Sequence, residues 1–424
     1  MKASLIIAEG RVVTTVGYSQ SPQVGKALGE VITLTRGYVL VQGERILAVT
    51  DNYDEAMAYC DAETSTIDAT GKLVMPGYVD CHTHLSFAGW RDHELPLRLA
   101  GNSYLDILAS GGGIISTVTK TRAATPAELL AKVRSSLDTM LLHGTTTVEA
   151  KSGYGLTLED ELKQLRVLRE ADGQHPVDIV RTFMGAHALP PEYAANRKGY
   201  IGSLVHDMLP QVAAERLAEF CDCFCENKAF TIEECRKVLL AAQKLGLGAK
   251  VHADEITPLG GALLAAELGA VSAEHLIHAD SAHLVAMAAA KVIAVLLPAT
   301  SFILQTPKRA PFKEMLALGV PVAISTDYNP GTSPLPSMQL LQSMACFHYG
   351  FTPAQAFAAS TINAAHAIRR GEECGSLEAC KLADITILNA PSLDFVPYHL
   401  GVNLVDKVIK RGKLVVSEGK CIYG

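Results

Sequence analysis

The chain of 424 residues lacks a surplus of basic residues, since 37 lysines and arginines face 44 acidic residues and the net charge is −7. Nucleic acids and anionic membranes bind basic faces, so we expect neither as a partner. Long apolar runs are missing too. The most apolar stretch, 282–299, is interrupted by Lys291, and the N-terminal segment has only a short apolar run before Glu9. We therefore expect no membrane span and no secretory signal.

CxxC pairs, which are typical of zinc knuckles, are also absent. The ten cysteines do not follow the spacing of a small disulfide-bonded domain, so we expect reduced thiols in a cytoplasmic protein. Cys221, Cys223 and Cys225 alternate along one predicted strand. Small apolar residues occupy a buried strand in the same way, so we expect a structural role, with a soft-metal site as the alternative.

What the chain does have, from residue 74 on, is a repeated unit of a short β-branched run, a polar or glycine-rich loop and a helix. One predicted helix covers 125–144, with Thr125 as N-cap and Pro126 at its first position. Eight parallel βα units are the number that closes a TIM-type (β/α)8 barrel. The eight predicted strands are 74–80, 145–150, 178–186, 220–225, 249–253, 271–275, 292–298 and 321–326.

The two ends of the chain differ from this pattern, because both contain only short strand-like runs. Neither end is large enough to bury the face of a sheet by itself. We therefore predict a small β-sandwich domain built from both ends, with residues 1–73 and 379–424 flanking a barrel of residues 74–378.

Polar residues collect at the predicted strand tips, where a barrel of this kind places its active site. The first strand is followed by His82 and His84, which project to the same face and can bind one metal ion as a bidentate pair. The alternative is a polar loop with chance histidines. Further tips carry His187, His252, His275 and Asp327. Three imidazoles and one carboxylate suit Zn²⁺ or iron, and a metal ion there activates water for hydrolysis.

These residues resemble the amidohydrolase superfamily and, within it, the imidazolonepropionase family of histidine degradation. The resemblance extends from about residue 76 to about residue 406. It is carried by the segments HTHLSFAGWRDHE, EAKSGYGL, FMGAHALPPEY, VHADE, STDYNPGTSP and VPYHLGVNLV. The family commonly has glycine where this chain has Cys380, a position outside the predicted barrel.

The resemblance implies a metal-dependent hydrolase that opens the ring amide C–N bond of 4-imidazolone-5-propanoate to give N-formimidoyl-L-glutamate. It implies that the metal ligands are His82, His84, His252 and Asp327. Asp327, His275 and Glu255 would be the catalytic residues, with Asp327 moving the proton of the water to the leaving nitrogen. The residues that would bind the substrate are Arg91, Tyr154, His187, Glu255, Asn329, Gly331 and Thr332.

Several of these residues also have a plainer interpretation. Arg91 could pair with Asp92 or Glu94, Tyr154 could be a packing aromatic, Glu255 could cap the next helix, and Asn329 could fix the turn before Pro330.

Two-metal relatives bridge their ions with a modified lysine at the end of the fourth strand, where this chain has Cys225, so one Zn²⁺ or Fe ion per subunit is favoured. Lys228 lies beyond that tip and Lys151 follows the second strand. The remaining alternatives are another cyclic amidohydrolase, a nucleobase deaminase, and a non-catalytic scaffold of the same fold. A small-molecule substrate and a homodimer are implied by the resemblance alone.

Overall fold

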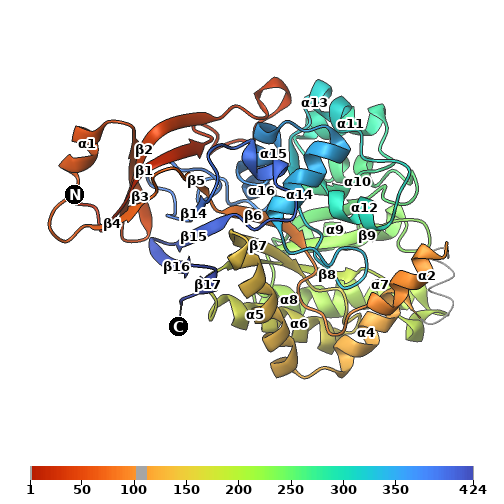
Figure 1. Ribbon diagram of the computed structural model, residues 1–424. Coiled ribbons are helices and arrows are strands. Elements are labelled where there is room, and N and C mark those ends of the chain that lie inside the picture. Colours follow the sequence, from red (N-terminus) through yellow and green to blue (C-terminus); the bar gives the residue numbers. More distant parts are fainter. Residues whose placement is uncertain (1, 102–111, 424) are drawn as a thin grey trace.

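The computed structural model describes residues 2–101 and 112–423, whose strands form two sheets (Figure 1). One sheet has eight strands in sequence order, and all its neighbouring pairs are parallel. A bridge between Thr83, in the first strand, and Tyr328, four residues beyond the last strand, brings the two edges of the sheet together and closes the predicted barrel. Its strands are β6 (Tyr78–Thr83), β7 (Thr145–Lys151), β8 (Asp178–Ala186), β9 (Phe220–Cys225), β10 (Gly248–Ala253), β11 (Ser272–His275), β12 (Ile293–Leu296) and β13 (Val322–Ile324).

Helices connect the barrel strands and cover the outside of the barrel (Figure 1). The predicted helix at 125–144 is α5 (Pro126–Leu142). Its N-cap is Thr125, whose hydroxyl accepts from the Glu128 N–H while the Glu128 carboxylate accepts from the Thr125 N–H, which satisfies two amides at the helix start. The other barrel helices are α2 (Leu95–Leu99), α4 (Gly113–Ala123), α6 (Leu158–Asp172), α7 (Arg197–Ser203), α8 (Leu209–Ala214), α9 (Ile232–Lys244), α10 (Gly261–Glu267), α11 (Ser281–Ala290), α12 (Pro298–Ile303), α13 (Phe312–Leu318), α14 (Met338–Met344), α15 (Pro353–Ala359) and α16 (Ile362–His366).

The first barrel strand begins later than the sequence pattern predicts. Residues 74–80 are divided between β5 (Leu73–Pro76), which pairs in the other sheet, and β6. The chain changes sheet at Gly77, where a Cβ would lie 2.2 Å from the Thr146 hydroxyl oxygen. An unbroken apolar run hides such a change, because both sheets bury their strands. As a result His82 lies inside the strand, and only His84 lies beyond it.

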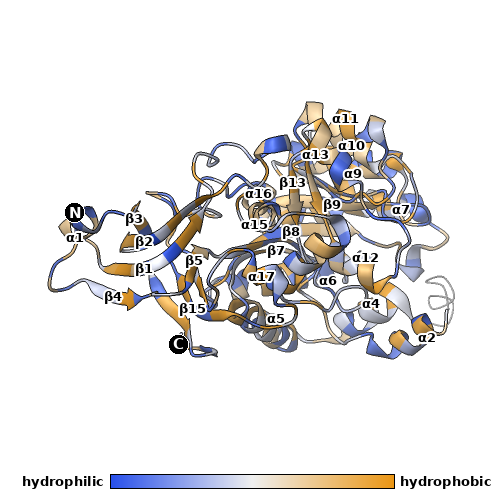
Figure 2. Cartoon of the chain, turned by 45° about the horizontal axis from the view of Figure 1, so that its top comes forward, coloured by the Kyte–Doolittle hydropathy of each residue, from blue (hydrophilic) through white to orange (hydrophobic). Residues whose placement is uncertain are grey.

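The second sheet is mixed and contains both ends of the chain, as predicted. Its order is β17-β16-β15-β14-β5-β1-β2-β3, with β4 paired to β1. Apolar residues line its strands (Figure 2), and side chains such as Ile7, Val39 and Ile385 share one core. Its strands are β1 (Leu5–Thr14), β2 (Ile32–Gln42), β3 (Arg45–Thr50), β4 (Ser65–Asp68), β14 (Ile385–Leu388), β15 (Val405–Lys410), β16 (Lys413–Ser417) and β17 (Lys420–Cys421), with α1 (Tyr53–Ala58) and α17 (Phe395–Tyr398) beside them.

Cys380 lies just before this C-terminal group of strands and has a φ of +73°. Glycine adopts that left-handed conformation without strain, whereas other residues adopt it at a cost. This explains physically why glycine suits the position. The division into residues 1–73, 74–378 and 379–424 stays a prediction.

The C-terminal segment packs against the barrel after β17. The Tyr423 hydroxyl donates to the Asp138 carboxylate on α5, and the Tyr423 ring lies edge-on to His175, with 5.1 Å between the ring centres. His175 Nε2 lies 3.3 Å from the same carboxylate, while its Nδ1 accepts from the Val177 N–H. His175 is therefore held as a neutral ring. None of the helices in the described ranges combines the length and apolar character needed to cross a membrane.

Candidate metal centre and active site

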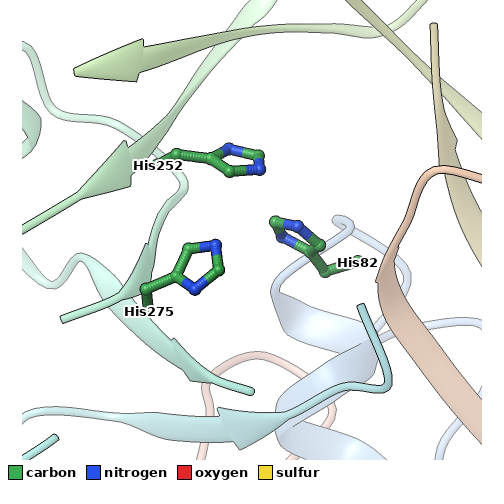
Figure 3. Close-up of side chains that lie close together, drawn as sticks. All are labelled: His82, His252 and His275. Carbon is green, nitrogen blue, oxygen red and sulfur yellow. The ribbon is translucent and has the colours of Figure 1, made fainter. Parts of the chain in front are cut away.

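Four histidines and an aspartate converge at the C-terminal ends of the barrel strands. His82 lies in β6 and His84 just beyond it, His252 lies in β10, His275 ends β11, and Asp327 follows β13. Each is at most 4% exposed. Figure 3 shows the rings of His82, His252 and His275 around one common space. The structure therefore brings together five of the six residues predicted at the strand tips, and the sixth, His187, stacks on His84.

The spacing of the ligand atoms fits a bound cation. His84 Nε2 lies 3.3 Å from His252 Nε2 and 3.4 Å from Asp327 Oδ1, and His82 Nε2 lies 3.5 Å from the same oxygen. Ligands about 2.0–2.1 Å from a tetrahedral Zn²⁺ lie about 3.3–3.4 Å from one another. In addition, His82 Nε2 is buried without a hydrogen-bond partner in the protein. These four residues, hereafter the ligand cluster, thus fit a metal ion.

The protonation states of the buried side chains also favour the binding of a cation. Burial, followed by the nearby charges, lowers the pKa values of His82, His84 and His275 well below the ordinary range. Their rings are therefore neutral and can offer lone pairs. Burial raises the pKa of Asp327 to about 6, because a lone carboxylate is poorly solvated there.

A second group of ligand atoms, from His82, Asp222 and Glu274, lies beneath the first. A lysine already supplies the positive charge there, since Lys151 Nζ lies 3.0 Å from Asp222 Oδ2 and 2.6 Å from Glu149 Oε1. Lys151 projects into the barrel rather than following β7, which differs from our expectation. Lys228 is exposed in the loop after β9, as predicted. Among the described residues, the ligand cluster therefore suits a metal ion better than this second group does.

Glu255 faces His275 across the site, with Oε2 3.6 Å from His275 Nε2. Burial and the Asp327 charge raise the pKa of Glu255 to about 8, so this carboxyl group is largely protonated at neutral pH and can donate a proton. Glu255 does not cap α10. Asp254 does so instead, because its carboxylate accepts from the N–H groups of Gly260 and Ala262.

Arg91 lies at the mouth of the site and is 6% exposed. Its Nε lies 3.2 Å from Glu94 Oε1, so the ion pair considered from the sequence is present. The guanidinium also lies against Gly331, where a Cβ would be 2.1 Å from one of its terminal nitrogens. Both residues therefore belong to one wall of the site.

His187 and Tyr154 form an aromatic wall beside His84. The His187 ring stacks on His84 with 4.8 Å between ring centres, and the Tyr154 ring centre lies 5.3 Å from that of His187. His187 Nδ1 donates to the Gly153 carbonyl oxygen, which leaves Nε2 as the acceptor. Burial lowers the pKa of His187 to about 3, so this ring is neutral as well.

Asn329 fixes the turn after β13, which is its plainer interpretation. Its Oδ1 accepts from the N–H groups of Gly331 and Thr332, and its Nδ2 donates to the Thr332 hydroxyl. A contact of Asn329 or Thr332 with substrate stays a prediction.

Three buried residues beside the ligand cluster were not predicted. Glu274, Asp222 and Thr300 each lie within hydrogen-bond distance of a different ligand residue. The available signal was a charged residue inside an apolar strand: Asp222 interrupts the cysteines of β9, and Glu274 precedes His275. Thr300 carries no such signal, because threonine is ordinary in any helix.

The cysteines form no part of the site. Cys221, Cys223 and Cys225 are buried, and the thiols of Cys223 and Cys225 contact Cys235 on α9. In the described part of the chain, no group of residues suited to a metal ion contains a cysteine. This supports the structural role over the soft-metal alternative.

Comparison with known proteins agrees with the fold and the site. The model of the amidohydrolase family matches residues 73–415. The chain belongs to the amidohydrolase family. It is 50% identical over 412 residues to the imidazolonepropionase of Shouchella clausii, covering 96% of this chain and 92% of that one. It is 47% identical over 422 residues to the imidazolonepropionase of Alkaliphilus metalliredigens, covering all of both chains. Within the amidohydrolases, the chain therefore belongs to the imidazolonepropionase family.

Solved structures of other enzymes share the fold at low sequence identity. An adenosine deaminase from Xanthomonas campestris with bound zinc matches with a TM-score of 0.71 at 19% identity, covering 99% of this chain and 94% of that one. The atrazine chlorohydrolase of Arthrobacter aurescens, in a complex with zinc, matches with a TM-score of 0.75 at 15% identity, covering 99% and 97%. These likenesses concern the fold alone.

Proposed function

We propose that the protein hydrolyses the ring amide C–N bond of 4-imidazolone-5-propanoate to N-formimidoyl-L-glutamate, the third step of histidine degradation. The observation that carries this proposal is the identity of about one half, over nearly the whole chain, to curated imidazolonepropionases. The ligand cluster supports it, because its donor set suits hydrolysis.

His82, His84, His252 and Asp327 would hold one divalent metal ion. Their neutral imidazoles and single carboxylate form a donor set that accepts zinc or iron. The bound ion would supply Lewis acidity, which makes water nucleophilic near neutral pH and polarises the ring carbonyl. Zinc is the first choice to test, because two solved structures with the same fold carry it.

Side chains of the protein would then carry out the proton transfers and donate hydrogen bonds to the substrate. Asp327 accepts the proton of the attacking water and passes it to the departing ring nitrogen. Glu255, protonated at neutral pH, donates a hydrogen bond to a ring nitrogen of the substrate. His275 is neutral, lies beside Glu255, and stabilises the developing charge on the ring oxygen.

The substrate would lie between the two walls of the site. The Arg91 guanidinium binds the propionate group, because a planar fork suits a carboxylate. Tyr154 and His187 contact the ring and tail from the aromatic wall. Gly331 leaves room for Arg91, and Asn329 and Thr332 shape the loop beside it.

The direct test is incubation of the purified, metal-loaded protein with fresh imidazolone propionate, following the loss of its ultraviolet absorbance. Guanine and adenosine serve as controls, because the fold is shared with deaminases. Turnover of either control in preference to the imidazolone would move the assignment to a deaminase.

The remaining proposals concern the state of the protein in the cell. All ten cysteines are free thiols, which supports a cytoplasmic location. A homodimer with one metal ion per subunit follows from the family resemblance. Light scattering on a size-exclusion column together with metal analysis would test both.

A further inference from the structure

Each of three residues in the ligand cluster lies beside a buried polar side chain from another element of the barrel. His82 Nδ1 lies 2.9 Å from Glu274 Oε2, and His252 Nδ1 lies 3.0 Å from Asp222 Oδ2. The Thr300 hydroxyl donates to Asp327 Oδ2 over 2.6 Å. We call Glu274, Asp222 and Thr300 the outer partners. Each is at most 1% exposed.

The outer partners come from the parts of the barrel that supply no ligand. Asp222 lies in β9 and Glu274 in β11, the two strands that flank β10 and its His252. Thr300 lies in α12, directly after β12. The fourth, sixth and seventh βα units therefore contribute side chains to the same site as the first, fifth and eighth units, which supply the proposed ligands.

Each outer partner lies beside one polar atom of a ligand side chain, and the other polar atom of that side chain faces the cation position. His82 Nδ1 hydrogen-bonds to Glu274, which places the lone pair of this ring on Nε2, the atom that faces the cluster. The backbone N–H of His252 donates to Asp222 Oδ1, and the Nε2 atom of His252 also faces the cluster. Thr300 binds one oxygen of Asp327, and the other lies 3.4–3.5 Å from His84 and His82. The tautomer of His82 and the orientation of Asp327 are thus set by the protein itself.

The two outer carboxylates are themselves held in place. Lys151 Nζ lies 3.0 Å from Asp222 Oδ2 and 2.6 Å from Glu149 Oε1. Glu274 accepts from the Ser272 hydroxyl, and Lys250 Nζ lies 3.8 Å from it. A buried carboxylate with such partners keeps its orientation, so it can orient a ring.

We propose that Glu274, Asp222 and Thr300 are positioning residues that preorganise the ligand cluster and thereby set its metal affinity. The inference rests on the proposed metal ligands and goes beyond them, since none of the three touches the substrate in this assignment. Outer partners of this kind typically account for a 10- to 100-fold difference in metal affinity.

The test measures zinc affinity of the metal-free protein by competition with a chromophoric chelator, with no reliance on turnover. Asp222→Asn, Glu274→Gln and Thr300→Val keep the size of each side chain and remove the charge or the hydroxyl. Each should weaken zinc binding about 10- to 100-fold. Thr300→Ser keeps the hydroxyl and should bind zinc within about threefold of the original protein.

A matched control is available in the mixed sheet. Asp384 is 3% exposed and pairs with the buried Lys410 over 2.6 Å, as Asp222 pairs with Lys151, but it lies outside the site. Asp384→Asn should lower the free energy of unfolding and leave zinc affinity unchanged. A loss of affinity in this control equal to that of Asp222→Asn would show general destabilisation and overturn the proposal.

Two further outcomes separate the inference from the proposed function. If Thr300→Val and the carboxylate variants that fold bind zinc as tightly as the original protein, the inference is overturned, while the assignment of the ligand cluster is unaffected. If the original protein binds no zinc and no iron(II), while its folding is intact, the ligand cluster fails and the inference fails with it. The comparison of Thr300→Val with Thr300→Ser tests the inference even where a carboxylate variant does not fold.

Discussion

Adding one methyl group at Gly331 should displace Arg91 without removing any charge. The Cβ of an alanine would lie 2.1–2.2 Å from two atoms of the guanidinium, far inside van der Waals contact. The backbone of Gly331 is not in the left-handed region, so alanine itself is tolerated there. The Arg91 side chain is therefore the group that must move.

The expected magnitude follows from the contact that Arg91 would make with the substrate carboxylate. A charge-assisted hydrogen bond contributes about 1.5–3 kcal/mol, which corresponds to about 10- to 150-fold in affinity. Gly331→Ala should lower kcat/KM for imidazolone propionate by a factor in this range, chiefly through KM. Metal content should not change, because Arg91 contacts none of the proposed ligands.

The assay is the decay of the ultraviolet absorbance of the substrate, measured for Gly331→Ala, Arg91→Met and the double variant. If alanine acts through Arg91, the double variant should be no worse than Arg91→Met alone. The control is Gly202→Ala on α7, where no atom lies within 4 Å of the added Cβ. Unchanged kinetics in Gly331→Ala, or a full further loss in the Arg91→Met background, would refute the reasoning.

Three further predictions concern the metal site, the thiols and acid stability. His252→Ala or Asp327→Ala should leave a folded protein with far less than one metal per chain or almost no turnover, and full metal content with normal activity would contradict the assignment of that residue. Cys223→Ala should cost about 1 kcal/mol of stability and leave metal content unchanged; a drop in metal would revive the soft-metal alternative. Burial lowers the pKa of His175 from 6.5 to about 4, so the folded state disfavours its protonation. Stability should therefore fall as the pH drops from about 6.5 toward 4, by up to about 3 kcal/mol at 1.36 kcal/mol per pKa unit. In urea melts at pH 7.5 and pH 5, His175→Gln should lose less stability on acidification than the original protein, and an equal loss would count against this role.

The barrel could be predicted from the sequence because its signal is local and repeated. Each βα unit carries its own apolar run and its own helix, and capping residues such as Thr125 mark where a helix starts. The strand tips of a closed barrel must meet at one end, so His252 and Asp327 could be assigned to one site although they lie 75 positions apart. The sequence alone thus determined the fold class and indicated strand-tip residues that the structure brings together.

Other features depended on tertiary contacts that leave no local pattern. The change of sheet at Gly77 was invisible because strands of both sheets are buried and apolar alike. The buried position of Lys151 depends on the carboxylates of Glu149 on its own strand and Asp222 on β9, and their proximity compensates for burying its charge. The hydroxyl of Thr300 acquires its role because α12 places it beside Asp327. Sequence patterns determined which groups could do chemistry, whereas the packing of distant strands decided which neighbours hold them in place.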